Sequence, residues 1–138
     1  MATIIKWQGG MAFEGTTESG HSVLMDAAPE VGGENKGARP MEMVLLGLGG
    51  CTSIDVIMML QKSKQAVDDC QVEITAERSD SIPKVFTKIH VHFKITGQDL
   101  NLKKVERAVN LSAEKYCSVS KMLEHSVEMS HDFEIVAP

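Results

Sequence analysis

A long, almost uncharged segment between Met43 and Leu60 constrains the fold of this chain more than any other feature. Over its eighteen residues it carries a single charged side chain, Asp55. A segment of that length and composition is a candidate membrane span. However, three glycines stand in its first half, and amphipathic segments make up most of the remaining chain. We therefore expect a helix that is buried on all sides within a folded protein.

Shorter strand-like and helical segments flank this helix. Alternating apolar and polar residues, separated by Gly and Pro turns, predict six strands. Apolar residues at helical spacing predict two further helices. The predicted strands are Ala2–Gln8, Ala12–Thr17, His21–Asp26, Gln71–Glu77, Val85–Thr96 and Val127–Val136. The predicted helices are Pro40–Ser63, Asp99–Glu114 and Cys117–Glu124. Residues 27–39 are predicted to form a flexible surface loop. The order β-β-β-α-β-β-α-α-β indicates one α+β domain over residues 1–138, with mostly antiparallel sheets wrapped around the long central helix.

The long helix also bears on the oligomeric state. A helix that is apolar on every side cannot be covered by one small sheet, because the sheet reaches only one of its faces. A second copy of the chain is the simplest cover. We therefore expect a homodimer.

Charge and cysteine content limit the partners and the compartment. The formal net charge of −5, with no run of Lys or Arg, argues against nucleic acid or an anionic membrane as a partner. No basic and apolar leader opens the sequence, so we expect a cytoplasmic protein. Its three cysteines have no short spacing, which argues against a disulfide framework or a zinc cage.

Two of the cysteines stand in unusual surroundings. Cys51 follows three glycines within four positions, each costing about 1 kcal/mol in a helix relative to alanine. This leaves room for a substrate beside the sulfur, or for another backbone packed against a buried thiol. Cys117 lies at the junction of the last two predicted helices, where a helix N-terminus, Lys115 and Lys121 would favour its thiolate. It is equally compatible with a small capping residue.

The remaining candidates favour structural roles. Cys70 follows two aspartates, which disfavour a thiolate, and is interpreted as structural. His90 and His92 share one strand face and form a possible two-ligand metal site. Because Lys88 and Lys94 lie on that same face, a solvated polar surface is the preferred interpretation.

Both reactive-cysteine segments resemble the motifs of a known family. Pro40–Cys51 begins with a proline that opens the helix and ends with a cysteine eleven positions later, and Ala113–Ser120 surrounds the second cysteine. Together they resemble the two motifs of the OsmC/Ohr family, and the match extends along essentially the whole chain. The resemblance implies an OsmC-like fold, an intertwined homodimer and active sites at the subunit interface.

The resemblance also implies a chemistry. Family peroxidases reduce organic hydroperoxides with two cysteines and without metal or flavin. Carried over to this chain, Cys51 would attack the peroxide, Cys117 would resolve the sulfenic acid as a disulfide, and an external dithiol would reopen it.

Two departures concern the group that holds the peroxidatic thiolate. Family peroxidases use an arginine from the N-terminal strands, oriented by a glutamate directly after the helix-opening proline. Residues 1–38 contain no arginine, and Met41 occupies the glutamate position. The nearest replacements are Glu42 and Arg39, with Lys6 as another cation. In the second motif, Ser118 stands where the family usually has proline.

Two functions from different classes therefore remain. The leading hypothesis is a thiol-dependent hydroperoxide reductase, or a related stress-linked thiol protein, with Cys51 and Cys117 as its redox pair. The alternative is a non-catalytic dimer that binds a small apolar ligand at the subunit interface. Disulfide exchange on proteins is disfavoured, because a cysteine on an apolar helix is hard for a macromolecule to reach.

Overall fold

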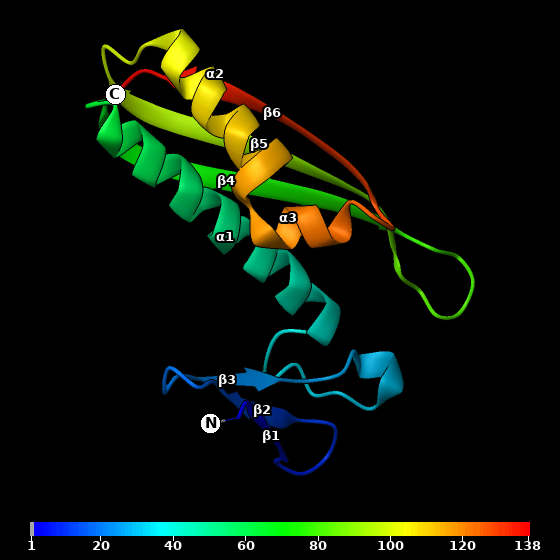
Figure 1. Cartoon of the computed structure of the whole chain (residues 1–138). Coiled ribbons are helices and arrows are strands. Elements are labelled where there is room, and N and C mark those ends of the chain that lie inside the picture. Colours follow the sequence, from blue (N-terminus) through cyan, green and yellow to red (C-terminus); the bar gives the residue numbers. More distant parts are fainter. Residues whose placement is uncertain (1) are drawn as a thin grey trace. The chain divides into compact units, whose positions relative to one another are not determined.

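The computed structural model describes residues 2–138, which group into two compact units. The N-terminal unit ends at Leu46, and the C-terminal unit runs from Gly47 to Pro138. The boundary falls inside the long helix α1 (Pro40–Lys62). The elements make an α+β protein with two three-stranded sheets, as predicted (Figure 1).

The N-terminal unit contains an antiparallel meander. Strands β1 (Ile4–Trp7), β2 (Phe13–Thr16) and β3 (Ser22–Met25) pair in sequence order. Gly9 and Gly10 form the first turn with φ values of 93° and 55°, a region that glycine occupies without strain. The turn glycines thus sit where the sequence pattern places them.

The loop that follows the meander is organised around a carboxylate rather than free of contacts. Asp26 is buried, and its side chain accepts hydrogen bonds from the backbone N–H groups of Ala27, Glu34 and Lys36 at 2.8, 3.0 and 3.1 Å. A 3₁₀ turn, η1 (Pro29–Val31), lies within the loop. One side chain thus satisfies three backbone donors across the loop. The predicted irregular loop is present, and its flexibility stays a prediction.

The C-terminal unit is built on a mixed sheet in the order β4-β5-β6. Strands β4 (Ala66–Arg78) and β5 (Phe86–Gln98) form a long antiparallel hairpin, while β6 (Glu128–Val136) pairs parallel to β5. The chain leaves β5 and returns through helices before it forms β6, and such a crossover is what a parallel pair requires. The other strand pairs are antiparallel, so the two sheets are mostly antiparallel, as predicted.

Three helices lie on one face of this sheet (Figure 1). Besides α1 they are α2 (Leu102–Leu111) and α3 (Ser118–Leu123), joined by a π-helical turn, η2 (Ser112–Tyr116). The buried side chains of β5 face them and alternate with polar ones on the opposite face: Ile89, Val91, Phe93 and Ile95. The core of the C-terminal unit lies between this face and the helices.

Within a single chain only one face of α1 is buried. The buried residues recur at every fourth position: Leu48, Thr52, Val56 and Leu60. Large apolar side chains elsewhere on the helix remain at the surface, with Leu46, Ile54 and Met58 exposed by 63, 65 and 47 %. The helix is therefore not buried on all sides within one chain, because the sheet reaches only the stripe that faces it.

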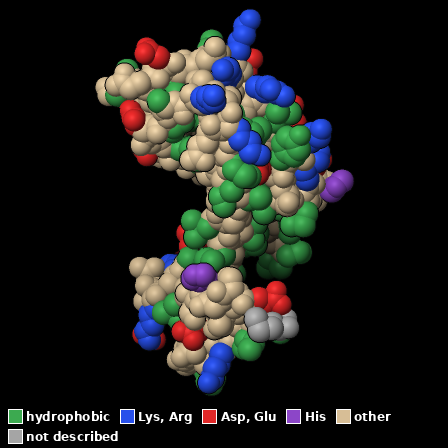
Figure 2. Space-filling model, turned by 60° about the vertical axis from the view of Figure 1, so that its left-hand side comes forward, with side chains coloured by type: hydrophobic (Ala, Val, Ile, Leu, Met, Phe, Trp, Pro, Cys, Tyr) green, Lys and Arg blue, Asp and Glu red, His purple; other side chains and the backbone are tan. Residues whose placement is uncertain are grey.

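Two further observations bear on this apolar surface. Figure 2 shows hydrophobic side chains at the surface between charged ones. Among the described residues, α1 is the one helix long and apolar enough to cross a membrane by length and composition alone. A core helix of a folded protein meets the same criterion, so this finding is weak evidence for a span.

Candidate functional site

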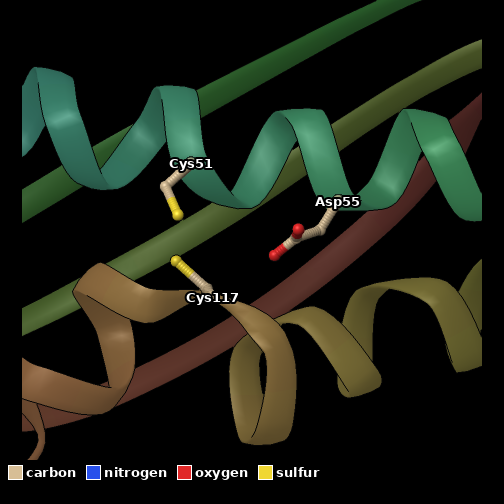
Figure 3. A group of neighbouring side chains, drawn as sticks. All are labelled: Cys51, Asp55 and Cys117. Carbon is tan, nitrogen blue, oxygen red and sulfur yellow. The ribbon is translucent and has the colours of Figure 1, made fainter.

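Two cysteines that are far apart in the sequence meet between α1 and the start of α3. The sulfur atoms of Cys51 and Cys117 and a carboxylate oxygen of Asp55 all lie within 4.8 Å of one another. Figure 3 shows the two sulfurs pointing toward each other, with the Asp55 carboxylate beside them. All three cysteines of the chain are free thiols. We call Cys51, Asp55 and Cys117 the dithiol cluster.

The π-helical turn places Cys117 in this cluster. The Cys117 N–H donates to the Ser112 carbonyl over 2.8 Å, which closes the turn. Cys117 then becomes the N-cap of α3, where its sulfur accepts a hydrogen bond from the Ser120 N–H at 3.4 Å. π-helical turns are frequent at functional sites. This one is followed by extended backbone at Cys117, which starts the separate helix α3.

The protonation of Cys117 is governed by its burial. Burial raises the pKa of the Cys117 thiol to about 11, and the neighbouring Cys51 also raises this pKa, whereas backbone N–H groups of α3 lower it. The N–H groups of the helix N-terminus thus favour the thiolate, as expected, but they do not make Cys117 acidic, because burial has the larger effect. The side chain is fully inaccessible, and the loss of water outweighs the two N–H groups.

The two lysines expected to favour a Cys117 thiolate are engaged elsewhere. Lys121 forms an ion pair with Glu124 at 2.6 Å and also donates to the Glu114 carbonyl. The Lys115 ammonium lies 5.3 Å from the centroid of the Tyr116 ring. These contacts explain why neither lysine counteracts the effect of burial on the thiol.

Asp55 is the member of the cluster that was not predicted from the sequence. It follows Cys51 by one helical turn, so both side chains project from the same side of α1. The Ser112 hydroxyl lies 3.1 Å from Asp55 Oδ2 and 2.7 Å from the Thr52 hydroxyl. Ser112 can donate its one proton to Asp55 while it accepts from Thr52, so the carboxylate is held by a buried two-hydroxyl chain. The four-residue spacing of Cys51 and Asp55 was the available signal.

Comparison with known proteins identifies the family. A family model described as OsmC-like protein matches residues 33–132 of the chain. The chain belongs to the OsmC-like family. It is 49 % identical to Protein YhfA of Escherichia coli over 137 residues, which cover 99 % of both chains.

Solved structures agree with this assignment. A hypothetical protein from Aquifex aeolicus is 29 % identical, with a TM-score of 0.87 over 99 % of this chain and 96 % of that one. An organic hydroperoxide resistance protein OsmC from Legionella pneumophila shares the fold, with a TM-score of 0.72, 22 % identity and 97 % coverage of both chains. The predicted OsmC-like fold is thereby confirmed.

The two other candidate residues of this OsmC-like chain, Arg39 and Glu42, stand at the beginning of α1. Glu42 Oε1 accepts a hydrogen bond from the Arg39 backbone N–H at 2.8 Å, as in a capping box. The Arg39 guanidinium donates to the Asn35 side chain at 3.0 Å and to the Gly37 carbonyl at 3.1 Å. Glu42 precedes Cys51 by nine residues of helix, a rise of about 13.5 Å. Both residues therefore have local structural roles, and their part in a reaction stays a prediction.

A groove adjoins the dithiol cluster. It has a volume of about 600 Å³ and lies between α1 and α2, with Asp55 and Tyr116 among its lining residues. Apolar side chains from both helices line it, together with three basic ones: Met58, Met59, Ala108 and Leu111, and Lys62, Lys104 and Arg107. The groove thus provides apolar surface that meets the dithiol cluster at Asp55, while Cys51 and Cys117 are not among its lining residues.

A second group of polar side chains lies on the exposed face of the sheet. We call His90, His92, Asp132 and Glu134 the histidine cluster. Asp132 Oδ1 lies 2.8 Å from His90 Nε2 and 2.7 Å from His92 Nδ1, and His92 Nε2 lies 3.3 Å from Glu134 Oε1. Hydrogen bonds to Asp132 and then to Glu134 raise the pKa of His92. This network agrees with the preferred interpretation of a solvated polar face.

Proposed function

We propose that this OsmC-like protein is a two-cysteine, thiol-dependent organic hydroperoxide reductase, with Cys51 peroxidatic and Cys117 resolving. The observation that carries the proposal is the approach of the two free sulfurs to within 4.8 Å between α1 and α3. Such an approach allows a disulfide after a small side-chain movement. The hydroperoxide resistance protein that shares the fold supports the same class of substrate.

The roles of the two cysteines follow from burial. Cys117 is fully buried and its pKa is raised to about 11, so it is protonated at neutral pH and out of reach of a bound peroxide. Cys51 is only partly buried, so it is the sulfur that a substrate reaches. Cys51 therefore attacks first, and Cys117 acts on the oxidised product.

The reaction balances in two steps. The Cys51 thiolate attacks the outer peroxide oxygen and the O–O bond breaks, which gives Cys51 sulfenic acid and an alkoxide that is protonated to the alcohol. The Cys117 sulfur then attacks the Cys51 sulfur, which releases water and forms the disulfide. The carboxylate of Asp55 is close to both sulfurs; it accepts the proton that leaves Cys117 and passes it to the departing hydroxide, which leaves as water. An external dithiol restores both thiols.

The test is mass spectrometry of the reduced protein after stoichiometric cumene hydroperoxide, compared with hydrogen peroxide. We expect rapid formation of a Cys51–Cys117 disulfide that is selective for the organic peroxide. Cys70→Ser serves as the matched control and should leave the disulfide unchanged. Slow oxidation of equal rate with both peroxides would rule out the reductase.

A second candidate function, the binding of a small apolar ligand without catalysis, is favoured by one observation. The groove of about 600 Å³ presents four apolar side chains next to the cluster. Under this alternative, a fluorescent fatty acid would bind equally well to the wild type and to a Cys51→Ser, Cys117→Ser double variant. Turnover of hydroperoxide by the wild type would exclude it as the main role.

The remaining features of the proposal concern assembly and location. We propose a cytoplasmic, intertwined homodimer that uses neither nucleic acid nor a membrane as a partner. The exposed apolar residues of α1 support a protein partner for this helix, and the net charge of −5 opposes polyanionic partners. Light scattering should give twice the chain mass of 15.1 kDa. In such a dimer, Glu42 and Arg39 of one chain would be available to the Cys51 thiolate of the other.

A further inference from the structure

We propose that the dithiol cluster is also a binding site for a thiophilic divalent cation, Zn²⁺, which Cys51, Asp55 and Cys117 coordinate. Binding of the ion would block the redox chemistry of the two thiols. The inference goes beyond the reductase, because the coordination requires only the three side chains and no peroxide.

The first support is the placement of the three donor atoms. Two sulfurs and one carboxylate oxygen lie mutually within 4.8 Å. Tetrahedral zinc with bonds of about 2.3 Å to sulfur and about 2.1 Å to oxygen separates its ligand atoms by about 3.6–3.8 Å. Small rotations of the side chains would therefore bring the donors to this spacing. Three protein ligands with one open position is a common arrangement of accessible zinc sites.

The second support is the way the backbone presents the donors. Cys51 and Asp55 stand one turn apart on α1, so they act as a pair on one side of a single helix. Cys117 approaches from the start of α3, which is held by the π-helical turn before it. Ligands from two separate elements close around an ion from two sides.

The third support comes from the groups behind the donors. The Ser112 hydroxyl donates to Asp55 Oδ2 at 3.1 Å, and the Ser120 N–H donates to Cys117 Sγ at 3.4 Å. Hydrogen bonds of this kind orient ligating groups and stabilise their charged forms. Both serines are buried, so these bonds are shielded from competing water.

The binding step balances without an oxidant. One Zn²⁺ binds two thiolates and one carboxylate, and the two thiol protons are released to solvent. No electrons are transferred. Each sulfur then donates one lone pair to the metal, which lowers its nucleophilicity and so slows attack on a peroxide. A Cys51–Cys117 disulfide has no thiolate to offer, so oxidation and zinc binding exclude each other.

The site differs from the histidine cluster, which also contains zinc-ligating residue types. There the ring nitrogens are already hydrogen-bonded, three of them to carboxylates and His90 Nδ1 to the Ser130 hydroxyl, and the side chains are exposed or half-buried. Thiolates are the softer ligands and bind zinc strongly. His92→Ala therefore provides a control variant that removes a histidine without touching the dithiol cluster.

The experiment is a titration of the reduced full-length protein with Zn²⁺ in competition with a chromophoric chelator, repeated with Co²⁺ as a spectroscopic probe. We expect one ion per chain and an absorption band from thiolate-to-cobalt charge transfer. Cys51→Ser and Cys117→Ser should each weaken binding by more than ~10-fold, and Ser112→Ala by about 10-fold or more through the carboxylate that it orients. His92→Ala and Cys70→Ser should bind as the wild type does.

A second measurement does not depend on how well the variants fold. Wild-type protein oxidised to the disulfide should lose zinc binding, and a reductant should restore it. Equal binding by reduced and oxidised protein, or loss of binding in His92→Ala, would overturn the inference. A protein that forms the disulfide with cumene hydroperoxide but takes up no zinc contradicts this inference alone, whereas zinc binding without peroxide reduction contradicts the reductase alone.

Discussion

The dithiol cluster and the histidine cluster are both compact groups of ligating side chains, but they are built in opposite ways. The histidine cluster comes from two neighbouring parallel strands, β5 and β6, and its members point to the open face of the sheet. The dithiol cluster joins α1 to the start of α3, and one of its members is fully buried. One cluster is assembled by strand register and the other by packing.

The two clusters also differ in how the surroundings stabilise the charged forms of their side chains. In the histidine cluster each charged form has a partner of opposite charge and access to water, so the groups stabilise one another weakly. In the dithiol cluster a thiol has lost its water without gaining a strong partner, since sulfur is a weak acceptor. The dithiol cluster therefore contains a thiol without water or an opposite charge beside it, and we propose that an oxidised Cys51 or a metal ion is its reaction partner.

The largest expected effect is that of removing the peroxidatic sulfur. Cys51→Ser should lower hydroperoxide consumption by ~10³-fold or more, because a hydroxyl does not replace the thiolate as a nucleophile. The rate is measured with cumene hydroperoxide and a dithiol reductant. His90→Ala in the exposed cluster is the matched control, and a comparable loss in that variant would contradict the contrast between the clusters.

Removing the resolving sulfur should separate the two steps. Cys117→Ser should still react once with the organic peroxide but should form no intramolecular disulfide, because the second sulfur is missing. Mass spectrometry should detect one added oxygen on Cys51, trapped by a sulfenic acid reagent. Formation of a Cys51–Cys70 disulfide at the wild-type rate would show that Cys117 is not the resolving residue.

Two serine substitutions compare the clusters directly in stability. Ser112→Ala should lower the free energy of unfolding by about 1–3 kcal/mol, because the buried Thr52 hydroxyl and Asp55 carboxylate lose their common partner. Ser130→Ala removes a 2.7 Å hydrogen bond to His90 on the exposed face and should change the free energy of unfolding by no more than about 0.5 kcal/mol. Urea denaturation measures both variants. Equal losses would show that burial does not distinguish the clusters.

The smallest expected effect is a pH dependence that belongs to the histidine cluster. Hydrogen bonds to Asp132 and Glu134 raise the pKa of His92, so its contribution to stability is complete below its unfolded pKa and is lost as the pH rises through the raised value. Hydrogen bonds from His92 lower the pKa of Asp132, so that contribution is lost as the pH falls through the lowered value. The pair should stabilise the fold most at mildly acidic pH.

The measurement is the urea midpoint of the wild type and of His92→Gln between about pH 5 and about pH 9. The difference between the two proteins should be largest at the acidic end and should shrink toward the alkaline end. A difference that grows with rising pH would contradict the assignment of the charged pair.

The sequence anticipated features that depend on local periodicity. The start of α1 at Pro40, the turn at Gly9 and Gly10, and the common face of His90 and His92 all follow from φ preferences and strand alternation. The family motifs identified the fold, and comparison confirmed it. Each of these features is set by residues that are close together along the chain.

Other features required the folded chain. The net direction of the Cys117 pKa shift was not predicted, because a helix N-terminus, which lowers the pKa, is visible in the sequence, but full burial of the sulfur, which raises it more, is not. Asp55 was noticed only as a charge in an apolar helix, since nothing local shows that Ser112 and a second thiol meet it. The parallel pairing of β6 likewise depends on where the crossover returns.

By itself, then, the sequence determined the helices, the strands and the family, because backbone preferences and motif spacing act over a few residues. Only the tertiary structure decided which side chains lie within reach of one another and which of them are buried from solvent. Those two quantities depend on packing between distant segments. They distinguish the dithiol cluster, for which we propose redox and metal chemistry, from the solvated polar surface around His92.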